Sequence, residues 1–113
     1  MDDLLWKPGP CLARLEAGDE RYVELFRRGT LSLELYAPRG RDPQSPHAQD
    51  ELYIVQQGHG KFRRARQVCE FAAGDVLFVP AGVEHRFEDF SADLCVWVVF
   101  YGVPGGEVPG AGA

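Results

Sequence analysis

The chain has 113 residues, 45% of them hydrophobic, so we predict one domain with a single core. Its 17 acidic and 12 basic residues give a net charge of −5 without a large basic cluster, which argues against a nucleic-acid partner. The longest apolar run, 94–101, is far shorter than the roughly 20 residues that a membrane-spanning helix needs, so we expect no membrane partner.

The N-terminus and the cysteines favour a cytoplasmic location. Two of the first three residues are aspartates, where a secretory signal would be basic. Cys11, Cys69 and Cys95 are odd in number and form no Cys-x-x-Cys pair, which argues against a disulfide framework and against a cysteine zinc site. We expect a soluble cytoplasmic protein whose thiols behave as small buried or half-buried hydrophobes.

Residues 1–18 are predicted to form an arm. Two prolines flank a glycine at Pro8-Gly9-Pro10, and proline inside a helix breaks it, so we expect no continuous helix here and a helical turn at most. The arm should lie across the outer surface of a domain formed by residues 19–101. The tail 102–113 is mostly glycine, proline and alanine and is predicted to be disordered.

Short stretches with alternating or β-branched residues follow the arm and predict strands. They span 21–28, 30–37, 51–57, 62–64, 67–71, 76–79, 83–88 and 94–101. Turn residues separate them, including Gly58-His59-Gly60, whose histidine should lie in solvent. This pattern predicts an all-β barrel or sandwich of antiparallel strands but does not distinguish a jelly roll from other barrels.

The stretch 94–101 is apolar on both of its faces. A strand of an antiparallel sheet usually has one polar face, so both sides of this strand need cover. One side can face the barrel interior, and the other can face the N-terminal arm with Trp6 or a second subunit. We expect a homodimer.

One stretch has the spacing of a known motif. Gly74, Pro80, Gly82 and His85 occur in order at fixed intervals, and His85 alternates with polar neighbours so that it points inward. This arrangement resembles the second motif of the cupin family, with Asp89 at the position where the family prefers asparagine. A lone inward histidine is more often a packed core residue, so the companion motif matters.

The companion motif is found upstream. Glu51 and Gly58 have the expected separation of six residues, which puts His47 at the second histidine position and Ser45 at the first. An alternative register makes His47 the first histidine and Gln49 the second, but it shifts the acid off its spacing. We prefer the first register and keep Gln49 as a possible auxiliary or water-holding ligand.

The resemblance implies a cupin double-stranded β-helix, that is, an antiparallel jelly-roll barrel. It also implies one divalent transition metal (Fe, Mn, Zn, Ni or Cu) held by His47, Glu51 and His85, with open coordination positions for water and substrate. Alternatively, the three side chains form hydrogen bonds in a metal-free pocket. The predicted pocket-lining residues are Tyr53 and Val55, which share the face of Glu51, together with Phe87, Tyr36 and Glu34.

Two classes of function fit this site. The first is a metal-dependent enzyme on a small organic substrate, dioxygenase-like with a redox-active metal or isomerase-like with zinc or nickel. The second is a non-catalytic module that binds a small ligand such as a sugar or a carboxylate. No residue in the sequence distinguishes them, and no general base or other catalytic residue is evident.

Overall fold

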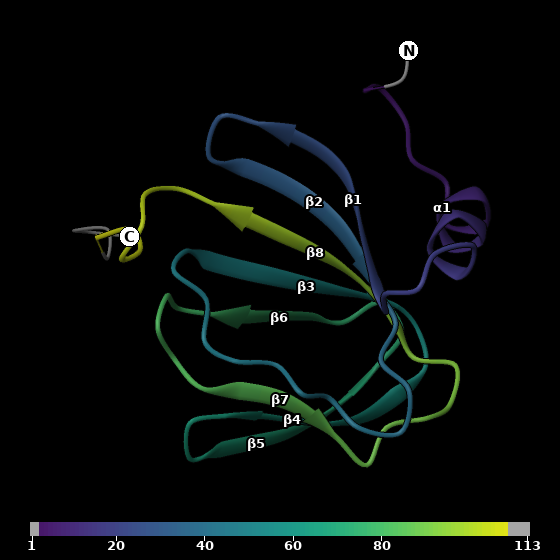
Figure 1. Cartoon of the computed structure of the whole chain (residues 1–113). Helices are drawn as coiled ribbons and strands as arrows, with labels where there is room; N and C mark the ends of the chain where they lie inside the picture. Colours follow the sequence, from purple (N-terminus) through teal and green to yellow (C-terminus); the bar gives the residue numbers. More distant parts are fainter. Residues whose placement is uncertain (1–2, 109–113) are drawn as a thin grey trace.

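The computed structural model describes residues 3–108, which form one helix and eight strands (Figure 1). Their bounds are α1 Pro8–Glu16, β1 Tyr22–Arg28, β2 Leu31–Tyr36, β3 Asp50–Gln57, β4 His59–Arg64, β5 Gln67–Ala72, β6 Val76–Val79, β7 His85–Glu88 and β8 Cys95–Tyr101. All of the paired strands are antiparallel. The prediction of an all-β, antiparallel domain is confirmed.

The strands form two sheets that face each other. The larger sheet has the order β1-β2-β8-β3-β6 and the smaller has the order β5-β4-β7. Figure 1 shows the larger sheet above and the smaller below, with the chain crossing between them several times. Consecutive strands β6 and β7 belong to different sheets, so the turn between them spans the two layers.

The main core lies between the sheets and is rich in aromatic side chains. Tyr53 of β3 packs edge-on against Phe87 of β7, with ring centroids 5.0 Å apart. Alternate residues of β8 point into this core, which explains one apolar face of that strand. The buried members are Tyr36, Tyr53, Val55, Phe62, Phe71, Val79, Phe87, Leu94, Val96 and Val98.

Helix α1 corrects the expectation for the N-terminal arm. The helix begins at Pro8 and includes Gly9 and Pro10 in its first turn. Prolines are tolerated there because the first-turn N–H groups have no partner within the helix. The prediction that these prolines prevent a continuous helix was therefore wrong, because it treated a helix start as a helix interior.

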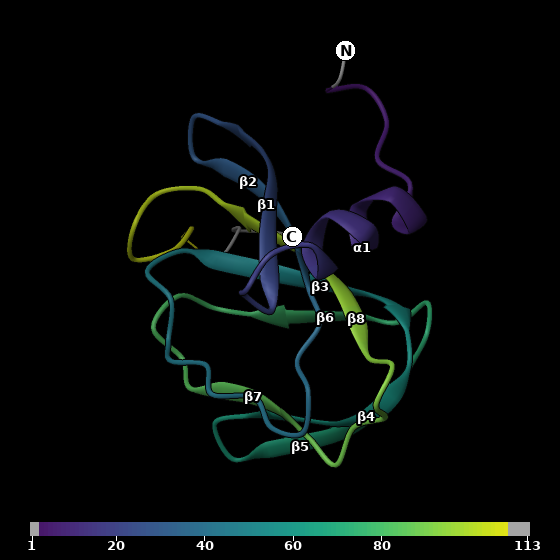
Figure 2. The same cartoon turned by 45° about the vertical axis from the view of Figure 1, so that its right-hand side comes forward.

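The outer face of β8 is covered by this helix at one end. Cys11 and Leu15 of α1 are buried against Leu35, Ala37 and Cys95, with Trp6 and Trp97 packed at the edge of the cluster. Figures 1 and 2 both place α1 outside the larger sheet. The N-terminal arm is thus the cover for Cys95 and Trp97, one of the two alternatives considered for the outer face.

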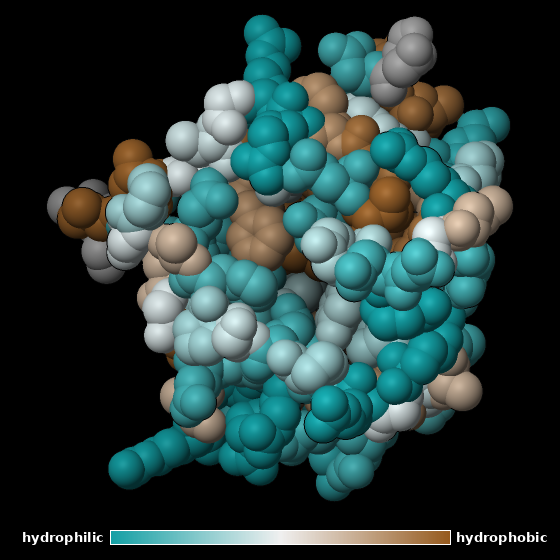
Figure 3. Space-filling model, in the orientation of Figure 1, coloured by the Kyte–Doolittle hydropathy of each residue, from teal (hydrophilic) through white to brown (hydrophobic). Residues whose placement is uncertain are grey.

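Surface hydropathy follows this arrangement. Figure 3 shows brown, apolar surface gathered toward the side where α1 lies, while hydrophilic side chains dominate the lower part of the same face. Across the larger sheet, Ile54, Val76 and Phe78 remain 38%, 59% and 41% exposed. Cys69 is also exposed, so the expectation of burial holds for Cys11 and Cys95 but was wrong for Cys69.

One segment differs in detail from the predicted turns. His59 begins β4, so the turn predicted at 58–60 was wrong, although the histidine is exposed as expected. Gly58 is required because its φ is +96° and a Cβ there would lie 2.7 Å from the Cα of Leu94.

The chain after β8 returns to the body of the protein. The Gly105 N–H donates to the Ala48 carbonyl at 2.7 Å, and the Glu107 N–H donates to Oδ2 of Asp50 at 2.8 Å. These contacts involve the first part of the tail that was predicted to be disordered. Residues 109–113 of that tail lie outside the described part of the chain. The boundaries 1–18, 19–101 and 102–113 stay predictions.

Within residues 3–108, no helix has the length and apolarity required to cross a membrane.

Candidate metal centre

Two chain segments are fastened together around the candidate site. His47 lies in the loop before β3, Glu51 is the second residue of β3, and His85 begins β7. The turn between β6 and β7 binds the first segment through its backbone. The Gly82 N–H donates to the His47 carbonyl at 2.8 Å, and the Ala81 N–H donates to Oδ1 of Asp50 at 2.9 Å. The fold therefore brings both motifs to one place.

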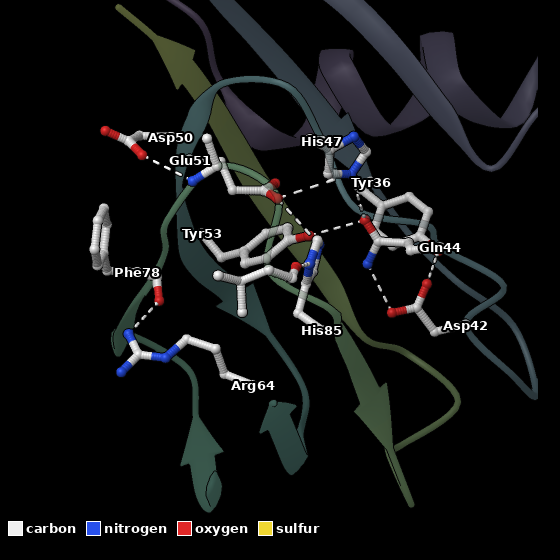
Figure 4. A network of polar contacts seen from close by, with 12 residues as sticks. Tyr36, Asp42, Gln44, His47, Asp50, Glu51, Tyr53, Arg64, Phe78 and His85 are labelled. Atoms are coloured by element: carbon white, nitrogen blue, oxygen red, sulfur yellow. Dashed lines mark hydrogen bonds and ion pairs between the residues drawn. The ribbon is translucent and has the colours of Figure 1, made fainter. Parts of the chain in front are cut away.

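The three predicted ligands converge in this place (Figure 4). One ligand atom from each of His47, Glu51 and His85 lies within 4.8 Å of the others. Nε2 of His85 is 3.0 Å from Oε1 of Glu51, and Nε2 of His47 is 3.8 Å from the same oxygen. The side chains of Glu51 and His85 are 1% and 0% exposed, whereas that of His47 is 33% exposed. His47 is thus the member of the cluster nearest to solvent.

A backbone contact fixes the tautomer of His85. Nδ1 of His85 lies 2.9 Å from the Val83 carbonyl oxygen. A carbonyl can only accept, so Nδ1 carries a proton and the neutral ring presents the lone pair of Nε2 to Glu51. This second contact of the ring is typical of metal-binding histidines.

The buried polar atoms of the cluster lack hydrogen-bond partners. Within the described residues, both carboxylate oxygens of Glu51 and Nε2 of His85 are buried without a hydrogen-bond partner, although the two side chains approach to 3.0 Å. A buried carboxylate without a partner costs several kcal/mol. A divalent cation shared with the imidazoles removes this cost, and imidazole nitrogen with carboxylate oxygen suits transition metals. The residues present therefore fit a metal ion.

The pKa values of the two histidines are shifted in opposite directions. Burial lowers the pKa of His47 below its ordinary value, and the nearby Glu51 carboxylate only partly offsets this. Burial also disfavours the charged form of His85, but contacts with Glu51 and the Val83 carbonyl outweigh it and raise the pKa of His85. His47 is therefore the more readily neutral ligand, and a proton competes with the metal mainly at His85.

A cavity of about 610 Å³ opens beside the cluster. His47 and Ser45 line it together with Tyr36 and Glu34, two of the predicted pocket residues. The other three predicted pocket residues, Tyr53, Val55 and Phe87, lie in the core between the sheets. Ser45 occupies the first histidine position of the motif, at the wall of this cavity.

Gln49, the proposed auxiliary ligand, has other partners. Its side-chain amide donates to the Thr30 carbonyl at 2.7 Å and to the Gly102 carbonyl at 3.0 Å. These bonds connect the loop before β3 with the turn between β1 and β2 and with the segment after β8. The contacts of Gln49 thus support a role in holding the loop.

The sequence analysis missed two polar residues beside the cluster. Asp42 is buried and accepts hydrogen bonds from the Tyr36 hydroxyl, the Gln44 amide and the Phe87 N–H. Oε1 of Gln44 accepts from the Tyr53 hydroxyl at 2.8 Å and lies 3.4 Å from Nε2 of His47. Both residues lie in a proline-rich loop without periodicity. The only sequence signal was that Gln44 directly precedes the first motif.

Comparison with known families agrees with this geometry. Residues 32–101 match the model of the cupin domain. The chain belongs to the cupin domain family. The predicted cupin barrel is thereby confirmed.

Relatives of this cupin support the same fold. An uncharacterized protein of Streptomyces coelicolor is 41% identical over 90 residues, which cover 78% of this chain and 86% of that protein. A crystal structure of a cupin-2 domain containing protein from Shewanella frigidimarina has a TM-score of 0.63 at 19% identity, covering 78% of this chain and 88% of that one. A structure named Fe(II) HppE in complex with substrate has a TM-score of 0.61 at 19% identity, covering 71% of this chain and 52% of that one.

Proposed function

We propose that this cupin is a metal-dependent enzyme that acts on a small organic substrate. The observation that carries the proposal is the convergence of His47, Glu51 and His85 with buried, unpartnered ligand atoms beside a cavity. The similarity to HppE, a structure with Fe(II) and a substrate, adds support from the fold alone. A barrel of this kind can hold both a metal and a small molecule.

The proposed ligands leave room for a substrate. Three protein ligands occupy only part of the coordination sphere of a transition metal, so exchangeable positions remain. When bound, the metal would polarise an oxygen of the substrate or, if it is redox-active, support chemistry with dioxygen. The position of His47 at the cavity wall means that a substrate in the cavity reaches the cluster from that side.

The chain itself would orient the substrate. Phe100 and Val98 form apolar wall, and Tyr36 lines the same cavity. Burial, together with the Asp42 carboxylate that accepts a hydrogen bond from its hydroxyl, raises the pKa of Tyr36 well above its ordinary value. Tyr36 therefore stays protonated at neutral pH. The arrangement suits a molecule with one apolar portion and one oxygen-bearing end.

The finer reaction type follows from the metal. Iron or manganese would favour a dioxygenase-like reaction, and zinc or nickel an isomerase-like one. A non-catalytic binding module is the alternative. The observation that favours it is Arg41 at the cavity wall, which could pair with a ligand carboxylate. For the enzyme, Asp42 is occupied by three donors and Glu51 belongs to the ligand set, so Glu34 in the cavity wall, whose pKa is raised by burial, is the candidate general base.

Metal analysis tests the proposal. Purified protein should contain close to one transition metal per chain, and His85→Ala should lose it with at least about a hundredfold loss of affinity, because a direct ligand is removed. The control is Gln49→Ala, which removes a polar side chain of the same loop that is bonded elsewhere. Oxygen consumption by the iron-loaded protein with small diols, thiols and phenols then separates an oxygenase from a binder. If the purified protein contained no metal and bound none on titration, the proposal of a metal-dependent enzyme would be refuted.

Two further expectations remain proposals. A cytoplasmic location stays a prediction from the composition. The homodimer stays a prediction as well. The outer face of β8 first suggested it, but α1 covers one end of that face, so a different surface is needed for the dimer contact. The exposed apolar side chains of β3 and β6 now support it instead.

A further inference from the structure

Asp42 fixes the orientation of the Gln44 side chain (Figure 4). Nε2 of Gln44 lies 2.7 Å from Oδ2 of Asp42. A carboxylate only accepts hydrogen bonds, so the NH₂ end of the amide must face Asp42 and the carbonyl oxygen Oε1 must face the opposite way. The Tyr53 hydroxyl donates to Oε1 at 2.8 Å, which is consistent with this orientation.

Asp42 is itself held in place by two other donors. The Phe87 N–H of β7 donates to its Oδ2 at 2.8 Å, and the Tyr36 hydroxyl of β2 donates to its Oδ1. Phe87 is two residues from His85 on the same strand. The loop that carries Gln44 is therefore anchored to the strand that carries His85, and the amide is not free to turn away.

The fixed carbonyl oxygen lies beside the ring nitrogen of one proposed ligand, His47. Oε1 of Gln44 is 3.4 Å from Nε2 of His47. Two atoms bound to one ion at 2.0–2.2 Å lie about 3.0 to 3.5 Å apart when the angle between them is between a right angle and the tetrahedral angle. The His85–Glu51 separation of 3.0 Å falls in this range, and the His47–Glu51 separation of 3.8 Å corresponds to an angle of about 130°.

We propose that Oε1 of Gln44 is a fourth protein ligand of the metal, in place of the histidine that Ser45 replaces in the first motif. This inference rests on the proposed metal centre. The oxygen has two lone pairs, so it can accept from Tyr53 and still face the ion. Gln44 directly precedes Ser45 in the chain, and its side chain lies next to His47, so it can supply the donor that Ser45 lacks.

The proposal has a consequence for metal preference. An amide oxygen is a harder donor than imidazole nitrogen, so a site with two imidazoles, one carboxylate and one amide oxygen should favour Mn²⁺ or Fe²⁺ more than a three-histidine site does. Gln44 would act as a specificity-determining residue for the metal. Replacing it with histidine should shift the preference back toward Cu²⁺, Ni²⁺ and Zn²⁺.

Calorimetric titration of the full-length apo protein with Mn²⁺ tests the assignment. Gln44→Leu, which has a similar volume and no donor, should weaken Mn²⁺ binding by about tenfold or more. Ser45→Ala is the matched control and should leave the affinity within about twofold. Tyr53→Phe should do likewise, because it removes the donor to Gln44 but leaves Oε1 in place. Unfolding of each apo variant checks that it is folded.

A spectroscopic readout separates a ligand from a support. On Zn²⁺ titration, the side-chain NH₂ resonances of Gln44 should shift in step with binding, while those of Gln49 should stay in place. Equal Mn²⁺ affinity of Gln44→Leu and wild type, or an unmoved Gln44 amide, would overturn the fourth ligand and leave the three-ligand site standing. Failure of the wild type to bind any metal would overturn the proposed function and the fourth ligand together.

Discussion

Nε2 of His85 lies 3.0 Å from Oε1 of Glu51 in the interior of the protein, and neither atom has a hydrogen bond. With the ring proton held on Nδ1 by Val83, two electron-rich atoms face each other. Such a contact is favourable only with a proton or a cation between them. This pair links the stability of the protein with its ligand state.

Glu51→Gln should therefore change stability in opposite directions with and without metal. In the presence of a chelator, at a pH above the raised pKa of His85, removing the buried charge should stabilise the fold by about 1–2 kcal/mol. With saturating metal, the wild type should be the more stable protein, because only it binds the ion tightly. Urea unfolding measures both. The exposed Glu24→Gln is the control and should change the unfolding free energy by less than about 0.5 kcal/mol. A loss of stability in the chelated variant would contradict the unpartnered state of Glu51.

Metal affinity should depend on pH through His85. The pKa of this residue is raised above its ordinary value of 6.5, so a proton occupies the ring increasingly as the pH falls through that raised value. The apparent affinity should then fall about tenfold per pH unit, with one proton released per metal bound. His47 has a lowered pKa and should add a second proton only at lower pH. Titration between pH 8 and pH 5, in buffers of different ionisation enthalpy, gives the proton count. An affinity that is constant across this range would contradict the assignment.

Leu15→Ala tests whether α1 is an integral part of the fold. Leu15 is 1% exposed and packs with Cys11 on Leu35 and Cys95. Truncating a leucine in such a site should cost about 2–5 kcal/mol of unfolding free energy. Because this cluster is on the outer face of the larger sheet, metal affinity should stay unchanged. Leu4→Ala is the control, since Leu4 is 86% exposed. Equal stability of the two variants would mean that the helix contributes little.

The homodimer can be tested at the surface that α1 leaves open. Val76 and Phe78 of β6 are substantially exposed beside Ile54 of β3, and burying them would remove apolar area from water. Sedimentation should give twice the chain mass of 12.6 kDa. Phe78→Lys should shift the protein toward monomer, and Leu5→Lys, a change at an exposed apolar residue of the N-terminal arm, should leave the dimer intact. A monomeric wild type would refute the prediction.

The sequence predicted the fold and the three clustered side chains well because both depend on local rules. Alternation and turn residues indicate strands, and the cupin motifs fix the spacing around Glu51 and around His85, which lie on strands, and around His47, which lies in the loop before β3. The fold then brings the three side chains together. The family match supports the fold, and the role of the three residues as ligands stays a prediction.

The features that were missed depend on position or on distant contacts. Pro8 and Pro10 were interpreted as helix breakers because proline disrupts a helix interior, but its effect reverses at the first turn. Asp42 and Gln44 lie in a loop whose sequence has no periodic pattern, so no pattern predicts where their side chains point. Their orientation is set by Tyr36, which lies across the turn from Asp42, and by Phe87, which is 45 residues from Asp42, so the folded chain is needed to bring these partners together.

The Gly82 N–H holds the segment of His47 through the main-chain carbonyl of His47, and the Ala81 N–H holds it through the Asp50 carboxylate. The first of these bonds uses main-chain groups at both ends, so it persists when nearby side chains are replaced, provided that the turn keeps its shape. Ser45, at the first histidine position of the motif, lies two residues from this bond. The position of the loop is therefore independent of which side chain residue 45 carries.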